Sequence, residues 1–211
     1  MAEDRKLKIL SALSLTESQV EKIKAVDPGI ELHWYGRKDV TRIPAELWRE
    51  AEILLTSLIA LPPAEQTPAL KWVQFYFAGV DKAFQQDIFQ RGGVQLTSAS
   101  GTMVSQMGEY VMMTLLMLGH KAPEMFRFQQ QKVWHEHRVE KLEPIELRGS
   151  TVGIVGYGSI GREVARLLYS YGAKVLATKL DVMHPEDEGY VPEGLGDPQG
   201  NYFHRLYPNE A

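Results

Sequence analysis

The sequence has 211 residues, of which 44% are hydrophobic and 24% charged, as is typical of a globular protein large enough for one large domain or two small ones. Its net charge of -4 gives no general attraction to nucleic acid or to an anionic membrane, so we exclude both as main partners. The sequence has no cysteine, and no stretch has the apolar length of a signal peptide or a membrane span, which together favour a cytoplasmic protein.

Five short apolar runs in the first 100 residues predict β-strands. They are LKIL (7–10), ELHWY (31–35), EILLTS (52–57), KWVQFYF (71–77) and VQLTS (94–98). After the first run, Thr16 and Gln19 have capping-box spacing, and Val20, Ile23 and Val26 then repeat at helical intervals. Strands that alternate with helices predict a parallel, doubly wound α/β sheet over about residues 1–100, because parallel neighbours need long crossover connections.

A segment dense in methionine and leucine follows this first unit. Its sequence, SQMGEYVMMTLLMLGHK (105–121), predicts a helix that is apolar on nearly every side and buried between layers, with its methionines in packing roles. A more polar helix is expected from Glu124 to Trp134, and a charged connection then leads to Ser150.

From Thr151 the pattern becomes strand, helix, strand. The strands are TVGIVG (151–156) and AKVLAT (173–178), and the helix SIGREVARLLYSYG (159–172) has an inward face. This face comprises Val164, Ala165, Leu167 and Leu168. The last thirty residues are rich in proline, glycine and acids, which predicts mostly loop.

Gly156, Gly158 and Gly161 satisfy the pattern G-x-G-x-x-G between this strand and helix. The first glycine permits a tight turn, the second lets a pyrophosphate approach the backbone, and the third lets the helix pack on the strand. The helix N-terminus offers free N–H groups to the phosphates. The pattern also occurs in purely structural turns, but its place after an apolar strand favours a dinucleotide-binding site.

The tip of the second strand bears on which dinucleotide is preferred. An acid that binds the adenosine ribose hydroxyls is expected there, but Lys179 occupies the position and Asp181 follows two residues later. A lysine pairs with the 2′-phosphate of NADP, and Thr178 could add a hydroxyl donor, which slightly favours NADP. In the alternative, Lys179 is solvated and Asp181 reaches back to the ribose of NAD.

Three stretches together resemble the D-isomer-specific 2-hydroxyacid dehydrogenases, a family that includes phosphoglycerate dehydrogenase, glyoxylate/hydroxypyruvate reductase and formate dehydrogenase. They are LKWVQFYFAGVD (70–81), SASGTMVSQMGEYVMMTLL (98–116) and IELRGSTVGIVGYGSIGREVA (145–165), and they occur in family order. The resemblance implies a flavodoxin-like substrate domain over residues 1–100. It also implies the first half of a Rossmann NAD(P)-binding domain over residues 101–211, beginning with the interdomain helix, and an active site in the cleft between the domains.

The resemblance further implies two binding segments and a homodimer through the nucleotide domain. The loop that matches Phe77, Ala78 and Gly79 presents backbone amides to the carboxylate of a small 2-hydroxy or 2-oxo acid, although Gly79 also fits an ordinary turn. Trp134 matches a family tryptophan, which we interpret as a packing residue. The expected cofactor-binding residues are Gly156, Tyr157, Gly158, Ser159, Ile160, Gly161, Thr178, Lys179 and Asp181.

In the family, hydride transfer between nicotinamide and substrate is assisted by an arginine, a glutamate and a histidine. All three belong to the segment after the second strand of the nucleotide domain, which would lie beyond Ala211. We therefore identify no catalytic residue and expect the 211-residue chain to be inactive alone. The histidines do not match the catalytic position, and His135 and His137 lack the partners of a metal site, so no metal is expected. The histidines are His33, His120, His135, His137, His184 and His204.

Two questions stay open at this point. With only half of the nucleotide domain, the strand TVGIVG has an exposed edge. A second copy of the chain or a complementing C-terminal fragment could cover it, or it stays uncovered in a truncated product. The alternative function is that of a non-catalytic, dinucleotide-binding interaction protein, similar to the corepressors related to this family.

Overall fold

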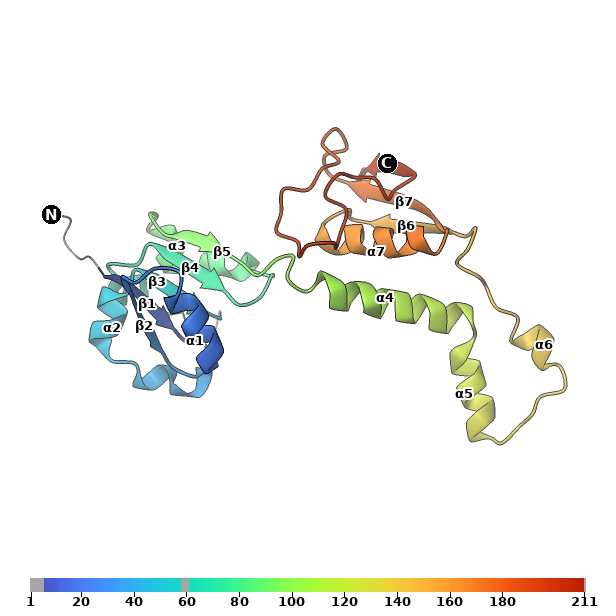
Figure 1. The fold of residues 1–211 in the computed structure, drawn as a ribbon, viewed down its shortest axis with the longest axis horizontal. Helices are drawn as coiled ribbons and strands as arrows, with labels where there is room; N and C mark the ends of the chain where they lie inside the picture. The colour runs from blue at the N-terminus through green and yellow to red at the C-terminus, as the bar shows by residue number, and fades with distance from the viewer. Residues whose placement is uncertain (1–5, 58–60, 211) are drawn as a thin grey trace. The chain divides into compact units, whose positions relative to one another are not determined.

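The computed structural model describes residues 6–57 and 61–210 (Figure 1). The chain divides into two compact units, with the boundary between Ala99 and Ser100. The first unit is built on a five-stranded sheet, and the second on a three-stranded sheet.

All strand pairs of the first unit are parallel, in the order β2-β1-β3-β4-β5. This is the flavodoxin-like order of doubly wound folds, so the predicted fold class is confirmed. The five predicted strands are all present. The elements are β1 (Leu7–Ser11), α1 (Glu17–Lys24), β2 (Ile30–Trp34), η1 (Arg37–Arg42), α2 (Ala45–Glu50), β3 (Ile53–Thr56), η3 (Ala64–Gln66), β4 (Trp72–Phe75), η4 (Asp81–Gln85), α3 (Asp87–Gln90) and β5 (Gln95–Thr97).

Helix α1 begins with the predicted capping box. The Thr16 hydroxyl accepts a hydrogen bond from the Gln19 amide at 3.3 Å, and the Gln19 side chain accepts one from the Thr16 amide at 2.9 Å. Val20 is buried against Ile9 and Leu32 of the sheet. The cap and this contact fix where the helix starts and which side it buries.

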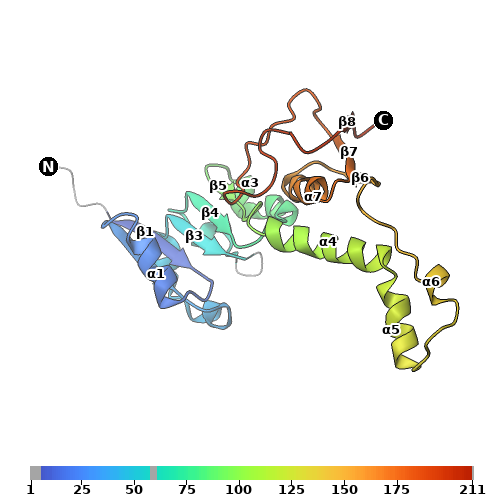
Figure 2. The ribbon, with the colours of Figure 1, turned by 45° about the vertical axis from the view of Figure 1, so that its right-hand side comes forward.

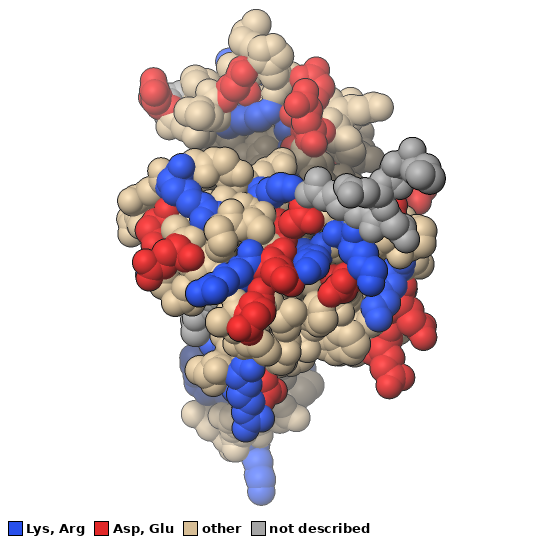
Figure 3. Space-filling view, turned by 90° about the vertical axis from the view of Figure 1, so that its left-hand side faces the viewer, with Lys and Arg blue, Asp and Glu red and all other residues tan. Residues whose placement is uncertain are grey.

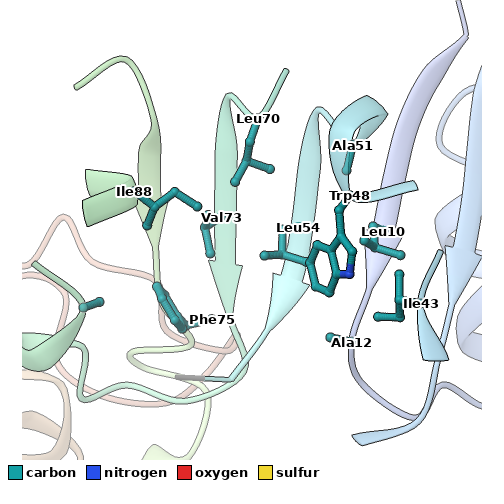
Figure 4. Packing of buried hydrophobic residues seen from close by; sticks show 11 residues of the cluster. Leu10, Ala12, Ile43, Trp48, Ala51, Leu54, Leu70, Val73, Phe75 and Ile88 are labelled. Atoms are coloured by element: carbon teal, nitrogen blue, oxygen red, sulfur yellow. The ribbon is translucent and has the colours of Figure 1, made fainter. Parts of the chain in front are cut away.

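Both faces of this sheet are covered, because side chains alternate along each strand. On β1, Ile9 packs on the side of α1, whereas Leu10 packs with Leu54 and with Trp48 of α2 on the other side (Figure 4). Val73 and Phe75 of β4 belong to the same cluster as Leu10, as do Leu70 and Ile88. The carboxyl ends of the strands are thereby held as a rigid edge that carries loops.

The second unit is a parallel sheet in the order β6-β7-β8 with α4 and α7 beside it (Figure 1). The predicted strand, helix and strand after Thr151 are confirmed. Residues 205–208 were expected to be loop but form β8, because their backbone pairs with β7 in parallel. The elements are α4 (Val104–Gly119), α5 (Ala122–Gln130), α6 (Arg138–Lys141), β6 (Thr151–Val155), α7 (Ser159–Ser170), β7 (Lys174–Lys179) and β8 (Arg205–Pro208).

Helix α4 packs along α7, as both views show (Figures 1 and 2). The contact is close at Gly108, where a Cβ would lie 2.9 Å from the Glu163 side chain. The expectation that α4 is buried between layers is wrong for the described residues, since α7 covers only one of its sides. Tyr110, Met113 and Met117 are exposed on the remainder of the helix.

The segment after α4 also differs from expectation. Helix α5 ends at Gln130 rather than at Trp134, and the connection that follows contains the short helix α6. The Trp134 side chain is 82% exposed and contacts the Arg138 guanidinium, which lies 4.6 Å from the ring centroid. The interpretation of Trp134 as a packing residue is therefore wrong within this chain.

Acidic and basic side chains are interspersed on the face of the molecule shown in Figure 3. No large patch of one sign covers that face, which agrees with the small net charge. Among the helices of the described residues, none is both long enough and apolar enough to cross a membrane.

Candidate functional site

The glycine turn lies between the end of β6 and the start of α7. Gly156 has a φ of 97°, in the region that favours glycine. A Cβ at Gly161 would lie 2.3 Å from the Gly156 carbonyl oxygen, so a side chain there would separate helix from turn. The conformational roles predicted for the first and third glycines are therefore confirmed.

Gly158 faces open space. A Cβ there would meet nothing within 4 Å, and its backbone is extended, with φ -91° and ψ -165°. Gly158 is also the N-cap residue of α7, and it adds no side chain to the helix end. The first amide to bond back into the helix is that of Arg162, which donates to the Gly158 carbonyl at 2.9 Å. The preceding amides of α7 thus form the positive end of the helix dipole beside an uncrowded backbone, which suits an anion.

Thr178 holds the turn from the side of β7. Its hydroxyl oxygen accepts a hydrogen bond from the Gly156 amide at 3.1 Å, and its carbonyl oxygen accepts one from the Tyr157 amide at 2.7 Å. Thr178 was expected to donate its hydroxyl to a 2′-phosphate. Here it lies beside the turn itself and fixes the turn's position.

Lys179 ends β7, as predicted, but its ammonium group is occupied. It donates to the carbonyl oxygen of His184, and to that of Glu186 at 3.2 Å. The Asp181 carboxylate accepts from the Met183 amide at 2.9 Å and lies 2.7 Å from His184 Nδ1. Both residues expected at the adenosine ribose therefore organise the loop after β7 in this structure.

The Asp181–His184 pair shifts the ionisation of both residues. The hydrogen bond from His184 lowers the pKa of the Asp181 carboxyl, and the same bond raises the pKa of the His184 imidazole. Both side chains are exposed, so the pair is a surface feature at the tip of β7.

The Tyr157 side chain is buried beneath the strands and loops that follow α7 rather than exposed at the turn. It is 2% exposed, its hydroxyl donates to the Asp197 carboxylate at 2.5 Å, and its ring meets Phe203 edge-on at 5.3 Å. Burial and the neighbouring Asp197 carboxylate raise the pKa of the phenol, which therefore stays a proton donor. Of the predicted cofactor contacts, Tyr157 offers only its backbone.

None of the sequence patterns above singles out Arg162, Glu163 or Asp197, yet all three are buried. A usable signal existed for Arg162, which lies three residues before the buried Ala165 and so falls on the same side of α7. No such signal marks Asp197, because it lies in a segment without periodicity.

A groove of about 360 Å³ runs beside the turn, along the free edge of β6. Its lining is mostly apolar and includes Leu115 of α4, Ile154 of β6 and Ile160 at the start of α7. Val155 at the end of β6 is 93% exposed. The edge strand is therefore uncovered among the described residues, as the sequence predicted.

The loop at residues 77–79 follows the carboxyl end of β4 in the first unit. Phe77 packs against the core, with its ring 6.1 Å from that of Phe75, and its carbonyl accepts from the Ala99 amide at 3.2 Å. Ala78 and Gly79 are exposed, and a Cβ at Gly79 would meet nothing within 4 Å. The backbone here is open to a small ligand.

The described residues contain no group of three or more side chains of the kinds that bind metals. The His135 ring stacks on Phe128 at 5.2 Å and lies 6.0 Å from the His137 ring. Glu136 and Glu140 are exposed. This connection offers aromatic packing rather than a ligand set.

Comparison with known proteins bears on what this arrangement is for. The model of a family described as "D-isomer specific 2-hydroxyacid dehydrogenase, NAD binding domain" matches residues 112–194, which include the glycine turn. The chain is similar in sequence and fold to the D-isomer-specific 2-hydroxyacid dehydrogenases. The resemblance that the sequence suggested is therefore confirmed at the level of the family.

Individual members of the family match longer stretches. The glyoxylate/hydroxypyruvate reductase A of Yersinia enterocolitica is 35% identical over 127 residues, which are 56% of this chain and 39% of that protein. The D-lactate dehydrogenase of Treponema pallidum is 29% identical over 74% of this chain and 48% of its own length. The chain thus spans about half the length of the curated relatives that it matches, or less.

A solved family structure from Aeromonas salmonicida aligns with 96% of this chain and 58% of its own, with a TM-score of 0.67 and 26% identity. The fold of both units is therefore that of a 2-hydroxyacid dehydrogenase.

Proposed function

We propose that these residues form part of an NAD(P)-dependent D-2-hydroxyacid dehydrogenase, which interconverts 2-hydroxy and 2-oxo acids. Residues 1–100 would form the substrate domain, and residues 101–211 the first half of the nucleotide domain. The observation that carries the proposal is the glycine turn, in which Gly156 and Gly161 shape the backbone and Gly158 leaves it open beside a helix N-terminus.

The glycine turn fits a pyrophosphate. The open space above Gly158 admits a phosphate group, and the first amides of α7, which include those of Ser159, Ile160 and Gly161, supply hydrogen-bond donors at the positive end of the dipole. The bound dinucleotide would supply the hydride that is exchanged with C2 of the substrate. Within this chain the proposed task is to bind and orient that dinucleotide.

The substrate carboxylate is proposed to bind at Phe77, Ala78 and Gly79. Backbone amides that are not crowded by side chains are good anion donors, and the exposed Ala78 and Gly79 fit this role. Core packing of the Phe77 ring supports the loop from behind.

NADP is slightly favoured over NAD. Lys179 is a cation at the tip of β7, where a 2′-phosphate would approach, whereas Asp181 is held by the Met183 amide and by His184. To bind a phosphate, Lys179 must exchange its loop carbonyl partners for phosphate oxygens, which are stronger acceptors.

We also propose that the protein forms a homodimer and that it is cytoplasmic. The exposed apolar residues of α4, Tyr110, Met113 and Met117, lie at helical intervals and form a stripe that a second copy could bury. A C-terminal fragment that completes the sheet beyond β6 is the other partner considered. The corepressor-type alternative is not favoured, because the relatives described above are named as enzymes.

In this proposal the 211-residue chain binds the dinucleotide, whereas proton transfer depends on family residues that are not identified in this sequence. The purified 211-residue chain is therefore expected to bind NADPH or NADH but not to reduce glyoxylate or hydroxypyruvate measurably. Absorbance at 340 nm would follow turnover, and fluorescence of the reduced nicotinamide would follow binding. Turnover at ordinary enzymatic rates would contradict this division.

A further inference from the structure

The segment between β7 and β8 is anchored to the start of α7 by a buried polar cluster. We call residues 185–203 the strap; they pass the N-terminal end of α7 (Figure 1). The cluster comprises Tyr157, Arg162 and Asp197, whose exposed fractions are 2%, 1% and 2%. The dinucleotide-binding role proposed above uses none of these side chains.

Asp197 is the centre of the cluster. One carboxylate oxygen accepts from the Tyr157 hydroxyl at 2.5 Å and from the Tyr202 amide at 2.9 Å, and the other accepts from the Asn201 amide at 2.7 Å. Its carbonyl oxygen accepts from Arg162 at 2.6 Å. One residue of the strap thus connects the strap's own turn to both α7 and the glycine turn.

Arg162 ties the beginning of the strap to the same place. Its guanidinium donates to the carbonyls of Pro185 and Glu186 at 2.5 and 3.0 Å, lies 3.4 Å from the Asp187 carboxylate, and stacks over the Tyr157 ring at 4.8 Å. Nearby, the Glu163 carboxylate accepts from the Gly196 amide at 2.6 Å. The strap is therefore held at two points far apart in its sequence.

Burying charged groups carries a desolvation free-energy penalty, and apolar side chains of similar volume would cover α7 with a smaller penalty. What the polar cluster adds is a single defined geometry, because each hydrogen bond fixes a direction as well as a distance. Tyr157 lies between Gly156 and Gly158 in the sequence, so the hydrogen bond from its hydroxyl to Asp197 restrains the backbone of the turn. Thr178 restrains the same turn from the side of β7.

We propose that the strap orders the glycine turn, and that Tyr157 and Asp197 are positioning residues that hold the turn's amides in their anion-binding arrangement. The consequence for dinucleotide affinity rests on the proposed function, whereas the ordering of the turn does not. A turn that is already ordered loses less conformational freedom when a ligand binds.

Tyr157→Phe tests the proposal with little change in shape, and Tyr169→Phe is the matched control, since it removes a phenol hydroxyl from a half-exposed residue of α7. Amide hydrogen exchange without ligand reports on the turn through Gly156 and Arg162, and on the core through Leu168 and Val175. We expect exchange at Gly156 and Arg162 to rise about tenfold more in Tyr157→Phe than exchange in the core, and no such difference in the control.

Dinucleotide affinity is the second measurement. NADPH or NADH is expected to bind Tyr157→Phe about fivefold more weakly. Without the hydrogen bond from Tyr157 to the Asp197 carboxylate, the turn is less ordered before the dinucleotide binds. Asp197→Asn serves as a second variant, because it keeps the shape of the side chain but removes its charge and one of its two acceptor oxygens. Its effect is expected not to add fully to that of Tyr157→Phe, because both changes weaken the interaction between these two side chains.

The exchange and affinity measurements test the role of the strap and the proposed function separately. If the unmodified chain binds neither dinucleotide, the proposed function fails, while the exchange measurement still decides the role of the strap. If Gly156 and Arg162 exchange only in step with Leu168 and Val175 in both variants, the strap is a structural cover and the positioning role is wrong.

Discussion

Lys179 illustrates how a residue can be correctly placed by its sequence and still have a different environment from the one expected. It ends β7, but its ammonium group donates to the carbonyls of His184 and Glu186. The sequence position predicts the approach of a phosphate, whereas the loop that supplies the competing carbonyls depends on the path of the chain after β7.

Lys179→Asp is expected to reverse the preference for NADPH over NADH. The variant replaces a cation that attracts a 2′-phosphate by an anion that repels it and accepts bonds from ribose hydroxyls, so NADPH affinity should fall about tenfold. Isothermal titration with both dinucleotides measures this. Lys174→Asp, at the other end of the same strand, serves as the control. Equal affinities before and after the change at Lys179 would contradict its proposed role.

The pair of Asp181 and His184 predicts a pH dependence of the loop after β7. The pKa of His184 is raised above 6.5, so its stabilising contribution is complete below pH 6.5 and disappears as the pH rises through the folded pKa. The pKa of Asp181 is lowered below 3.8, so its contribution is present above pH 3.8 and disappears as the pH falls through the folded value.

NMR titration of the His184 ring checks this pair. The ring is expected to titrate above 6.5 in the unmodified chain, and Asp181→Asn is expected to bring its pKa back toward that value. A His184 pKa unaffected by the substitution would show that the two side chains do not interact in solution. His120, an exposed histidine of the same unit, provides the reference signal.

At the scale of elements, periodicity and caps predicted the strands and helices well. The five apolar runs, the capping box at Thr16 and the inward face of α7 were all confirmed, because each depends on local spacing. Residues 205–208 were not predicted to form β8, since a four-residue strand with a proline carries little local signal and forms by pairing with β7.

Burial was harder to predict than secondary structure. A helix that is apolar on nearly all sides was expected to be covered, but α7 covers only one side of α4 in the described residues, and exposed methionines remain. Conversely, no sequence pattern singled out Arg162 and Asp197, and both are buried, because partners 35 residues apart along the chain satisfy them. Composition of a segment does not reveal which distant segment will cover it.

The exposed stripe of α4 yields a prediction about association. Met113→Glu places a charge in the stripe of Tyr110, Met113 and Met117, and is expected to convert a dimer into a monomer, because an interface cannot bury an unpaired carboxylate cheaply. Gln130→Glu adds the same charge at an exposed polar position of α5, outside the stripe, and serves as the control. Sedimentation velocity measures both variants. A chain that sediments as a monomer without any substitution would contradict the proposed homodimer.

At the scale of the whole molecule, the chain joins a doubly wound five-stranded sheet to a unit with a three-stranded parallel sheet, whose strand β6 has a free edge among the described residues. Family members have about twice the length that the alignments cover here. We therefore propose that these residues bind and orient the cofactor, and above all that the turn from Gly156 to Gly161 binds the pyrophosphate of a nicotinamide dinucleotide.

Titration of NADPH and NADH into the unmodified chain and into Gly158→Ala tests that claim most directly. The extended backbone of Gly158 accepts alanine without strain, but the new methyl group would occupy the space proposed for the pyrophosphate. Gly153→Ala, within β6 and equally free of neighbours, is the control. The account predicts that Gly158→Ala melts at the same temperature but binds at least about tenfold more weakly, a loss of about 1.4 kcal/mol, while Gly153→Ala binds normally. Unchanged dinucleotide affinity in Gly158→Ala, or no binding by the unmodified chain, would contradict it.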